Sequence, residues 1–170
     1  MYDVILADPP WRYSFSKSKS RSIDEHYPSM PLAEIKSLDI PSNADCVLYL
    51  WATAPKLLEA LDVLSAWGFT YKTHCVWDKC KLGMGYWFRG QHELLLVGVK
   101  GHVSPPAAAL RVSSVLRHPR GRHSKKPALV TALIGDWFPD ANKLELFCRY
   151  PTDGWDVWGN EVESNVVIEV

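Results

Sequence analysis

Three kinds of segment that would assign a protein class at once are missing from this sequence of 170 residues. No apolar run is long enough to cross a bilayer, which needs about 20 consecutive apolar residues. The first residues lack the basic and apolar regions of a secretory signal. The four cysteines contain no CxxC pair and do not resemble a disulfide framework. We therefore expect a cytoplasmic protein that has no membrane partner and no disulfide bonds.

Two common nucleotide-binding motifs are also absent. The sequence has no P-loop, and Gly83 and Gly85 are followed by Phe88 where a GxGxxG motif requires its third glycine. These absences disfavour an NTPase and a dinucleotide-dependent oxidoreductase.

A metal site is not indicated by the pattern of histidines and cysteines. His74, Cys75, Cys80 and His92 lie within one stretch of the chain. Their spacing matches no standard zinc pattern. We expect no bound metal, and we interpret these thiols as buried or incidental.

The formal net charge is zero, but the cationic residues are unevenly distributed. Lys17, Lys19 and Arg21 lie in a Ser-rich loop over residues 12–28. A second group lies between residues 100 and 126 and consists of Arg111, Arg117, Arg120, Arg122, Lys125 and Lys126, with His118 and His123 among them. Either group alone fits a solvated loop as well as a phosphate-binding surface. If both flank one site, phosphate contact is the better interpretation.

Segments with strand and helix patterns alternate along the chain. The expected strands are residues 3–8, 46–52, 69–77, 93–99 and 143–148, and a short last strand with its terminal loop lies within 154–160. The expected helices are residues 32–38, 55–67 and 127–136. Such alternation is typical of an α/β protein with a mostly parallel sheet flanked by helices.

The length of the chain fits one domain. We expect that domain over residues 1–164, followed by an apolar C-terminal tail, residues 165–170, that is flexible or packs on a partner. The long connection over residues 100–126 is rich in Pro, Ser, Arg and His, and connections of this length are usually functional or disordered.

The most informative segment is the tetrapeptide Asp8, Pro9, Pro10 and Trp11, directly after the first apolar strand. A central strand cannot continue through two prolines, because proline donates no ladder hydrogen bond. Ligands of open α/β sheets bind at the carboxyl ends of strands. A carboxylate, carbonyls without partners and a flat ring at such an end suit a planar heterocycle with an amino group, such as adenine. The alternative is a Pro-rich turn with a core tryptophan.

The tetrapeptide and several later motifs, taken together, resemble one known family. The later stretches are Tyr27, Leu50-Trp51, Glu93 through Gly101, Ser124 through Pro127, Leu144 through Arg149, and Gly154 through Glu161. In this order they are similar to the DPPW-type adenine-N6 methyltransferases, the family of the catalytic subunit of the eukaryotic messenger-RNA methyltransferase. The resemblance covers about residues 2–162 and is strongest to small bacterial and phage members.

The resemblance implies a fold, a cofactor and a set of site residues. It implies a Rossmann-like domain with circularly permuted motifs that binds S-adenosylmethionine. It implies that Asp8 and the Pro9 carbonyl accept from the target amine, with Pro10 completing the catalytic turn, and that Trp11 stacks on the base. The residues it places at the cofactor are Asp8, Lys126, Arg149, Asn160 and Glu161. For the substrate, the loops contribute Trp11, Tyr27, Lys17, Lys19, Arg21, Arg117, Arg120, Arg122 and Lys125.

The sequence departs from the eukaryotic subunit in two places. Tyr150, Pro151 and Thr152 follow Arg149 in place of a His-Asn pair, and Glu161 replaces a glutamine. We expect adenine-N6 methylation of nucleic acid, most favourably DNA, on a base that is single-stranded or flipped out. An RNA substrate and a non-catalytic, nucleic-acid-binding subunit are the alternatives.

Two further expectations concern partners and aromatic residues. The length leaves no room for a separate target-recognition domain, so we hypothesise that the chain forms a homodimer or reads a short sequence context through the loop over residues 100–126. Tyr86 and Trp87, within a Gly/aromatic loop from Gly83 to Gly90, fit pocket lining and core packing equally well.

Overall fold

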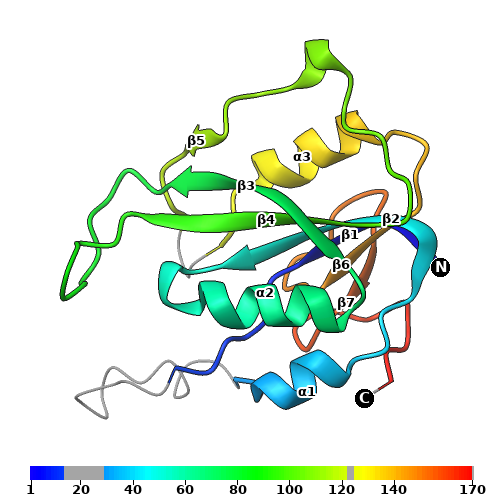
Figure 1. The fold of residues 1–170 in the computed structure, drawn as a ribbon, viewed down its shortest axis with the longest axis horizontal. Helices are drawn as coiled ribbons and strands as arrows, with labels where there is room; N and C mark the ends of the chain where they lie inside the picture. The colour runs from blue at the N-terminus through cyan, green and yellow to red at the C-terminus, as the bar shows by residue number, and fades with distance from the viewer. Residues whose placement is uncertain (14–28, 122–124, 170) are drawn as a thin grey trace.

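The computed structural model of the protein describes residues 1–13, 29–121 and 125–169. A seven-stranded sheet in the order β5-β3-β4-β2-β1-β6-β7 crosses the described part of the chain (Figure 1). The strands are β1 (Tyr2–Ala7), β2 (Ser42–Ala52), β3 (Thr70–Asp78), β4 (His92–Lys100), β5 (Val115–Arg117), β6 (Lys143–Leu146) and β7 (Asp156–Trp158). The expected α/β class is confirmed.

Most neighbouring strands are parallel, as the sequence predicts, and β4 is the exception. β1 is parallel to β2 and β6, β6 to β7, and β3 to β5. β4 runs antiparallel to both β2 and β3. The connection from β3 to β4, residues 79–91, contains no helix, and a parallel pair needs a crossover that is usually helical. Because β4 is reversed, its first residues lie at the edge where β1 and β2 end.

Helices cover both faces of this sheet (Figure 1). α1 (Leu32–Ser37) and α2 (Leu57–Ala66) lie on one face, and α3 (Ala128–Trp137) lies on the other. The short 3₁₀ turn η3 (Ala54–Lys56) leads into α2, with a proline in its first positions. Gly68 follows α2 at a φ of +83°, the left-handed conformation that commonly ends helices.

The apolar residues of β1 separate into two cores by their alternation along the strand. Ile5 faces the side of Ile35 and Leu64, from α1 and α2. Val4 and Leu6 face the other side, where the residues of α3 in the core are Val130 and Ile134. Both faces of the central strand are therefore buried, which explains its continuous apolar run.

The connection after β4 differs from the expected irregular segment. It contains the 3₁₀ turn η4 (Ala108–Leu110) and the edge strand β5, which pairs with the end of β3. A strand of three residues has too few positions to show a period of two, so its sequence does not reveal it.

Part of the segment over residues 165–169 packs against the domain that precedes it, although the Val167 side chain is 88% exposed. Ile168 is buried in the core beside Ile35 and Leu38. The Asp39 amide donates to the Glu169 carbonyl at 2.9 Å. At Ile168, the apolar character of the tail therefore serves packing within the domain. No helix in the described part of the chain is long and apolar enough to cross a membrane.

Candidate active site

The tetrapeptide ends β1 as the sequence predicts, and its backbone turns back on itself. The Asp8 amide still reaches the Leu146 carbonyl of β6, at 3.4 Å. The Pro9 carbonyl accepts the Trp11 amide at 2.8 Å, and the Pro10 carbonyl accepts the amide of Met30 at 3.0 Å. The expectation that these carbonyls lack partners is therefore wrong, because the turn folds back onto them. Each oxygen keeps a second lone pair.

Trp11 lies in the core beneath the site. Its side chain is 7% exposed, and its indole N–H donates to the Trp51 carbonyl at 3.1 Å. This bond ties the ends of β1 and β2 together, since Trp51 lies near the end of β2. In this conformation little of the Trp11 ring is available to a base, and its stacking role stays a prediction.

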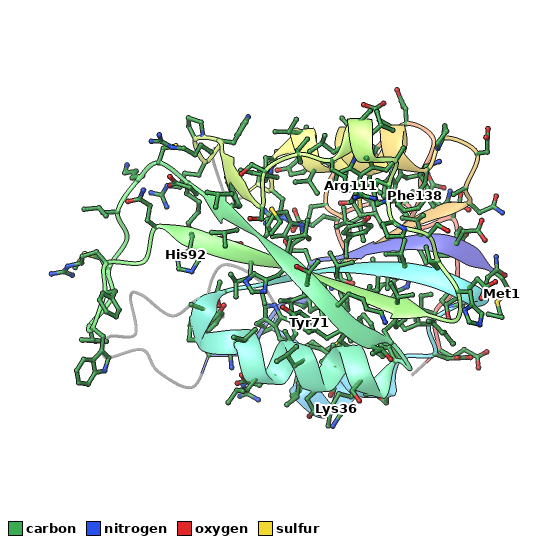
Figure 2. The ribbon with its side chains drawn as sticks, turned by 45° about the horizontal axis from the view of Figure 1, so that its top comes forward. Met1, Lys36, Tyr71, His92, Arg111 and Phe138 are labelled. Carbon is green, nitrogen blue, oxygen red and sulfur yellow. The ribbon has the colours of Figure 1, made fainter. Side chains whose placement is uncertain are left out.

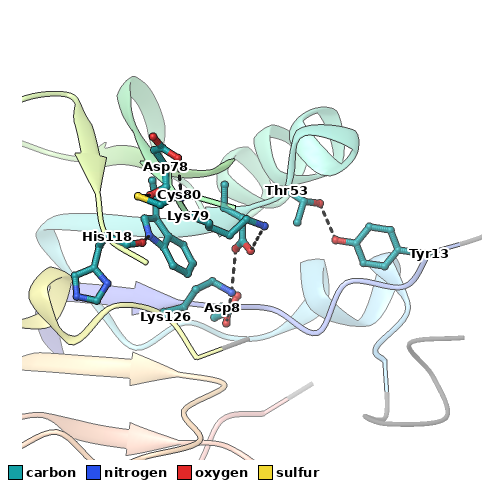
Figure 3. Close-up of polar contacts among 10 residues, drawn as sticks. Asp8, Tyr13, Thr53, Asp78, Lys79, Cys80, His118 and Lys126 are labelled. Atoms are coloured by element: carbon teal, nitrogen blue, oxygen red, sulfur yellow. Dashed lines mark hydrogen bonds and ion pairs between the residues drawn. The ribbon is translucent and has the colours of Figure 1, made fainter. Parts of the chain in front are cut away.

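A chain of alternating charges runs from Asp8 to the β3–β4 connection (Figure 3). Lys126 Nζ lies 2.7 Å from Asp8 Oδ2 and 3.2 Å from Glu93 Oε2. Lys79 Nζ lies 3.3 Å from the other Glu93 oxygen, Oε1. Glu93 is buried and is the second residue of β4. The reversed direction of β4 is what brings this second carboxylate to the edge where Asp8 lies.

The ion pairs decide the charge state of Lys126. Burial alone would lower its pKa, but the attraction of Asp8 and Glu93 and their hydrogen bonds outweigh burial and raise the pKa. The ammonium also lies 5.6 Å from the centre of the Trp51 ring, a cation–π distance. Lys126 therefore stays charged at neutral pH and holds the Asp8 carboxylate in place.

A cavity of about 280 Å³ opens beside Asp8. It lies between the ends of β1 and β6 and the start of α3. Its lining residues are Leu6, Asp8, Trp51, Lys125, Lys126, Pro127, Ala128, Val130, Thr131, Glu145, Phe147, Arg149, Tyr150, Pro151 and Thr152. The structure therefore brings together Asp8, Lys126 and Arg149, three residues that the sequence predicts at one site.

Glu145 is a cavity residue that the sequence reasoning did not single out. Burial raises its pKa most, and the Asp8 charge raises it further, against hydrogen bonds from Thr152 and Cys148. Thr152 Oγ1 donates to Glu145 Oε2 at 3.3 Å. A lone carboxylate inside the apolar run of β6 was the available signal, because such a residue is rarely buried without a partner or a function.

The backbone after β6 is bent sharply toward the cavity. Phe147 has a φ of +59°, a left-handed conformation that is uncommon for a bulky residue and is often found at functional sites. Its ring packs edge-on against Trp158 of β7, with centroids 5.2 Å apart. A side chain at Gly159 would overlap the carbonyl oxygen of Cys148. The ends of β6 and β7 are therefore in close backbone contact, for which glycine is needed.

The remaining cofactor candidates, Arg149, Asn160 and Glu161, lie in the segments that follow β6 and β7. Arg149 lines the cavity, and its Nε lies 3.0 Å from Glu161 Oε1. Asn160 is exposed in the turn that follows β7 and is not among the lining residues. The structure thus groups Arg149 with Glu161 and leaves Asn160 beside them at the surface.

Three of the basic substrate candidates lie near this edge of the sheet or on its approach. Arg117 Nε lies 3.3 Å from Asp78 Oδ2, at the end of β3. Lys125 Nζ lies 4.5 Å from the centre of the Tyr150 ring, next to the cavity. Arg120 is exposed on the connection between them. The other candidates, Lys17, Lys19, Arg21, Tyr27 and Arg122, lie outside the described residues.

Tyr13 was not anticipated from the sequence, although it closely follows the tetrapeptide. Its hydroxyl lies 2.7 Å from the Thr53 hydroxyl, and Lys56 Nζ lies 5.2 Å from its ring centre. Figure 3 shows Tyr13 and Thr53 on one side of Asp8 and the main chain of Lys126 on the other side. Tyr13 therefore links the segment after β1 to the one after β2.

A larger cavity of about 470 Å³ lies elsewhere, between the sheet, α3 and the connection that follows β4. Val97, Leu116 and Trp137 are among its apolar walls, and no Asp or Glu lines it. Without an acceptor of this kind it does not fit the polar chemistry of the tetrapeptide. Among the described residues, no three His, Cys, Asp or Glu side chains cluster as a metal site would require.

Comparison with known proteins decides the family. Residues 2–161 match MT-A70. The chain belongs to the MT-A70 family. It is 38% identical to "Type II methyltransferase M.MunI" of Mycoplasma sp, over 98% of this chain and 80% of the relative. It is 28% identical to "N(6)-adenosine-methyltransferase MT-A70-like" of Arabidopsis thaliana and 30% identical to "N(6)-adenine-specific methyltransferase METTL4" of Homo sapiens, but covers only 24% and 37% of those chains.

The match to MT-A70 confirms the resemblance drawn from the tetrapeptide and the later motifs. It also confirms the enzyme class: the protein is a methyltransferase, and the reaction of this class requires a methyl donor. The matched region extends from β1 to the turn after β7, so it contains both the Asp8 end of the sheet and the cavity beside it.

Proposed function

We propose that this MT-A70 protein transfers a methyl group from S-adenosylmethionine to the N6 amine of adenine in nucleic acid, with DNA as the favoured substrate. The observation that carries the proposal is the position of Asp8. Its carboxylate lines the cavity of about 280 Å³ and pairs with Lys126 at the end of β1. One carboxylate is thus available both to a donor in the cavity and to an acceptor at its edge.

The residues around the cavity suit a zwitterionic nucleoside donor. Lys126 and Arg149 are cationic and suit the carboxylate and hydroxyl oxygens of S-adenosylmethionine, whereas Glu145 and Thr152 offer acceptors for ribose hydroxyls. The cavity is close to the lower end of the range for ligand sites, about 300–1,000 Å³. When bound, the cofactor supplies an electrophilic methyl group on a sulfonium.

Asp8 can act on an incoming amine although it is already ion-paired. Lys126 approaches its Oδ2 atom, and a carboxylate has about four lone-pair sites on its two oxygens. The adenine amine is a weak nucleophile, because its lone pair is delocalised into the ring. Acceptance of its N–H bonds by Asp8 and by the second lone pair of Pro9 would favour the pyramidal geometry and stabilise positive charge as it develops on nitrogen.

The target base must leave a stacked helix to reach this edge. Extrusion costs roughly a few kcal/mol, and contacts between cations and phosphates can offset that cost. Arg117, Arg120 and Lys125 lie on the approach to the site, and Lys17, Lys19, Arg21 and Arg122 are proposed to add to them. Arg149, Asn160 and Glu161 are proposed to hold the nucleoside of the cofactor, and Tyr27 the substrate.

DNA is favoured by a relative that matches over most of both chains. The Type II methyltransferase of Mycoplasma sp shares 38% identity over 80% of its length, and Type II methyltransferases modify DNA. The relatives named as RNA methyltransferases match at 30% identity or less, over about half of their lengths. RNA is therefore the second candidate substrate.

The test is transfer of labelled methyl from S-adenosylmethionine to single-stranded DNA, duplex DNA and RNA, with products identified by mass spectrometry. We expect N6-methyladenine, made by the wild type and not by the Asp8→Asn variant. Calorimetric titration of S-adenosylmethionine without nucleic acid gives a second readout. Binding without transfer to any substrate would contradict adenine methylation, and no binding would favour the non-catalytic subunit.

Two further expectations, on the oligomeric state and the cellular location, are part of this proposal. A homodimer would add a second copy's surface to DNA recognition, and light scattering with and without DNA tests it. The cytoplasmic location expected from the sequence stays a prediction, which fractionation of cells that express a tagged chain would test.

A further inference from the structure

The connection between β3 and β4 ends in an unusually exposed aromatic tip. We define the hairpin tip as residues 84–89. Within it, the Trp87 side chain is 95% exposed and the Phe88 side chain is 89% exposed, next to an equally exposed Met84. Contiguous large apolar side chains are rarely left in water and mark interaction sites when they are.

The hairpin tip is carried on a hydrogen-bonded stem. The Lys79 amide donates to the Gln91 carbonyl at 2.9 Å, and the Gly83 amide donates to the Gly90 carbonyl at 2.7 Å. Asp78 Oδ1 accepts both from the Cys80 amide and from the Gln91 side chain, each at 2.8 Å. These contacts lower the pKa of Asp78, with the Gln91 hydrogen bond as the largest cause. These hydrogen bonds of the stem thus hold the tip away from the core.

The backbone inside the tip is also specific. A side chain at Gly85 would overlap the carbonyl oxygen of Phe88. The return of the chain between these residues therefore requires glycine, and it places Trp87 and Phe88 at the outer end of the loop.

The tip projects from the edge of the sheet where Asp8 lies. Figure 2 shows the loop extending beyond His92, whereas Tyr71, near the start of β3, lies toward the other end. The stem joins the site through Lys79, because Lys79 and Lys126 share the Glu93 carboxylate. Trp87 and Phe88 therefore lie at the same end of the sheet as Asp8 and not at the opposite end.

The charges of the hairpin select among partners. Residues 79–91 contain the cations Lys79, Lys81 and Arg89 and contain no Asp or Glu. Arg117, which pairs with Asp78, adds another cation beside the stem. Aromatic faces among cations without acids are the features that bind single-stranded nucleic acid, through stacking and phosphate contacts.

We propose that the hairpin tip stacks on the nucleobases next to the extruded adenine, through Trp87 and Phe88. The inference rests on the proposed function and deepens it. When one base leaves the stack, the faces of its neighbours lose their partner and become available to a flat ring. Trp87 and Phe88 supply that ring, and Lys81 and Arg89 contact the adjoining phosphates.

The test compares binding of a fluorescent, mixed-sequence single-stranded DNA by anisotropy at several salt concentrations. In the double variant Trp87→Ala/Phe88→Ala we expect the affinity to fall roughly 5- to 100-fold for each stacked base that is lost. The slope of log affinity against log salt should stay unchanged, because no charge is removed. Lys81→Gln/Arg89→Gln should instead reduce that slope. Val167→Ala, at a residue that is 88% exposed, is the control and should bind as the wild type does.

A second variant keeps the rings and changes only their placement. Gly85→Ala should lower the affinity in the same direction as the double variant, with an unchanged melting temperature of the domain, because the tip lies outside the core. Unchanged DNA affinity of Trp87→Ala/Phe88→Ala would overturn the inference. So would a dimer that becomes a monomer in this variant while DNA binding stays the same, since the tip would then contact a second copy.

Methyl transfer measured on the same samples separates this inference from the proposed function. Tip-dependent binding by a wild type that transfers no methyl group would contradict the activity and support the tip. If the double variant transfers methyl groups as fast as the wild type and binds DNA as tightly, the activity would be supported and the role of the tip overturned.

Discussion

Lys126 Nζ lies 2.7 Å from Asp8 Oδ2, although the two residues are 118 positions apart in the sequence. The contact joins the segment after β1 to the segment that leads into α3, and Glu93 of β4 joins it as a second carboxylate. The carboxylate at the centre of the proposed reaction is thus fixed by two other parts of the chain.

The carboxylate of Asp8 should be needed for methyl transfer more than for folding. We expect Asp8→Asn to lower kcat by about 100-fold or more, as loss of an oriented polar group in a transition state commonly does. Radiolabelled transfer on the best nucleic acid measures the effect. Asp62→Asn removes a carboxylate from a comparable pair with Lys36, at 2.8 Å, on the surface. An equal loss in both variants would contradict a specific role for Asp8.

Glu93 should act as a positioning residue through Lys126. In Glu93→Gln, Lys126 and Lys79 lose a shared anion, so we expect kcat/KM to fall by about 10-fold, the scale of one hydrogen bond to a charged group. Because Lys126 would then be held by Asp8 alone, its amine should deprotonate at lower pH, and the alkaline limb of the rate profile should shift down. Glu59→Gln, in the half-buried pair with Lys56, should leave the profile unchanged.

Glu145 should lower stability at neutral pH while serving the cofactor. Burial raises its pKa above the usual 4.5, so Glu145 binds a proton more readily in the folded state than in the unfolded state. Its stabilising contribution is full below about pH 4.5 and is lost as pH rises through the folded pKa. Glu145→Gln should therefore match the wild type in stability near pH 4. At pH 7 it should be more stable, by about 1.4 kcal/mol for each pH unit by which the folded pKa of Glu145 exceeds the unfolded pKa. Urea unfolding at both pH values measures this, and calorimetry should show weaker cofactor binding.

Two glycines allow a test of the close contact between β6 and β7: Gly159 lies at the contact, and Gly135 in α3 serves as the control. A side chain at Gly159 would overlap the Cys148 carbonyl, whereas one at Gly135 in α3 meets nothing within 4 Å. We expect Gly159→Ala to cost about 1–3 kcal/mol and to weaken cofactor binding. Gly135→Ala should stabilise the protein by about 0.5–1 kcal/mol. Similar unfolding curves for both variants would contradict the packing argument.

The features that the sequence predicted well are those with strong local causes. Two prolines stop β1 at Asp8 because they cannot pair, and the long apolar runs of β1 and β2 reflect burial on both faces. Lys126 was placed at the same site as Asp8 by the resemblance to the methyltransferase family and by no local pattern. The two residues pair in the structure.

The features that escaped the sequence depend on distant contacts. The reversal of β4 brings Glu93 to the site, and no local pattern encodes the direction of a strand. Burial of Trp11 depends on the carbonyl of Trp51, 40 positions away. Phe147 adopts a left-handed φ that its residue type disfavours, so only the packing around it can enforce that conformation.

The central place of β1 in the sheet has a consequence for how the protein is made. A ribosome synthesises β1 before the other six strands of this sheet, yet one of its two neighbours, β6, begins at Lys143. The hydroxyl of Tyr2 bonds the Asp156 carboxylate, 154 positions later. Until those residues emerge, a strand with both faces apolar has one open edge, and open edges promote pairing between nascent chains. Completion of the fold is therefore postponed until nearly all of these strands have been translated, and early truncation would produce aggregates instead of a smaller enzyme.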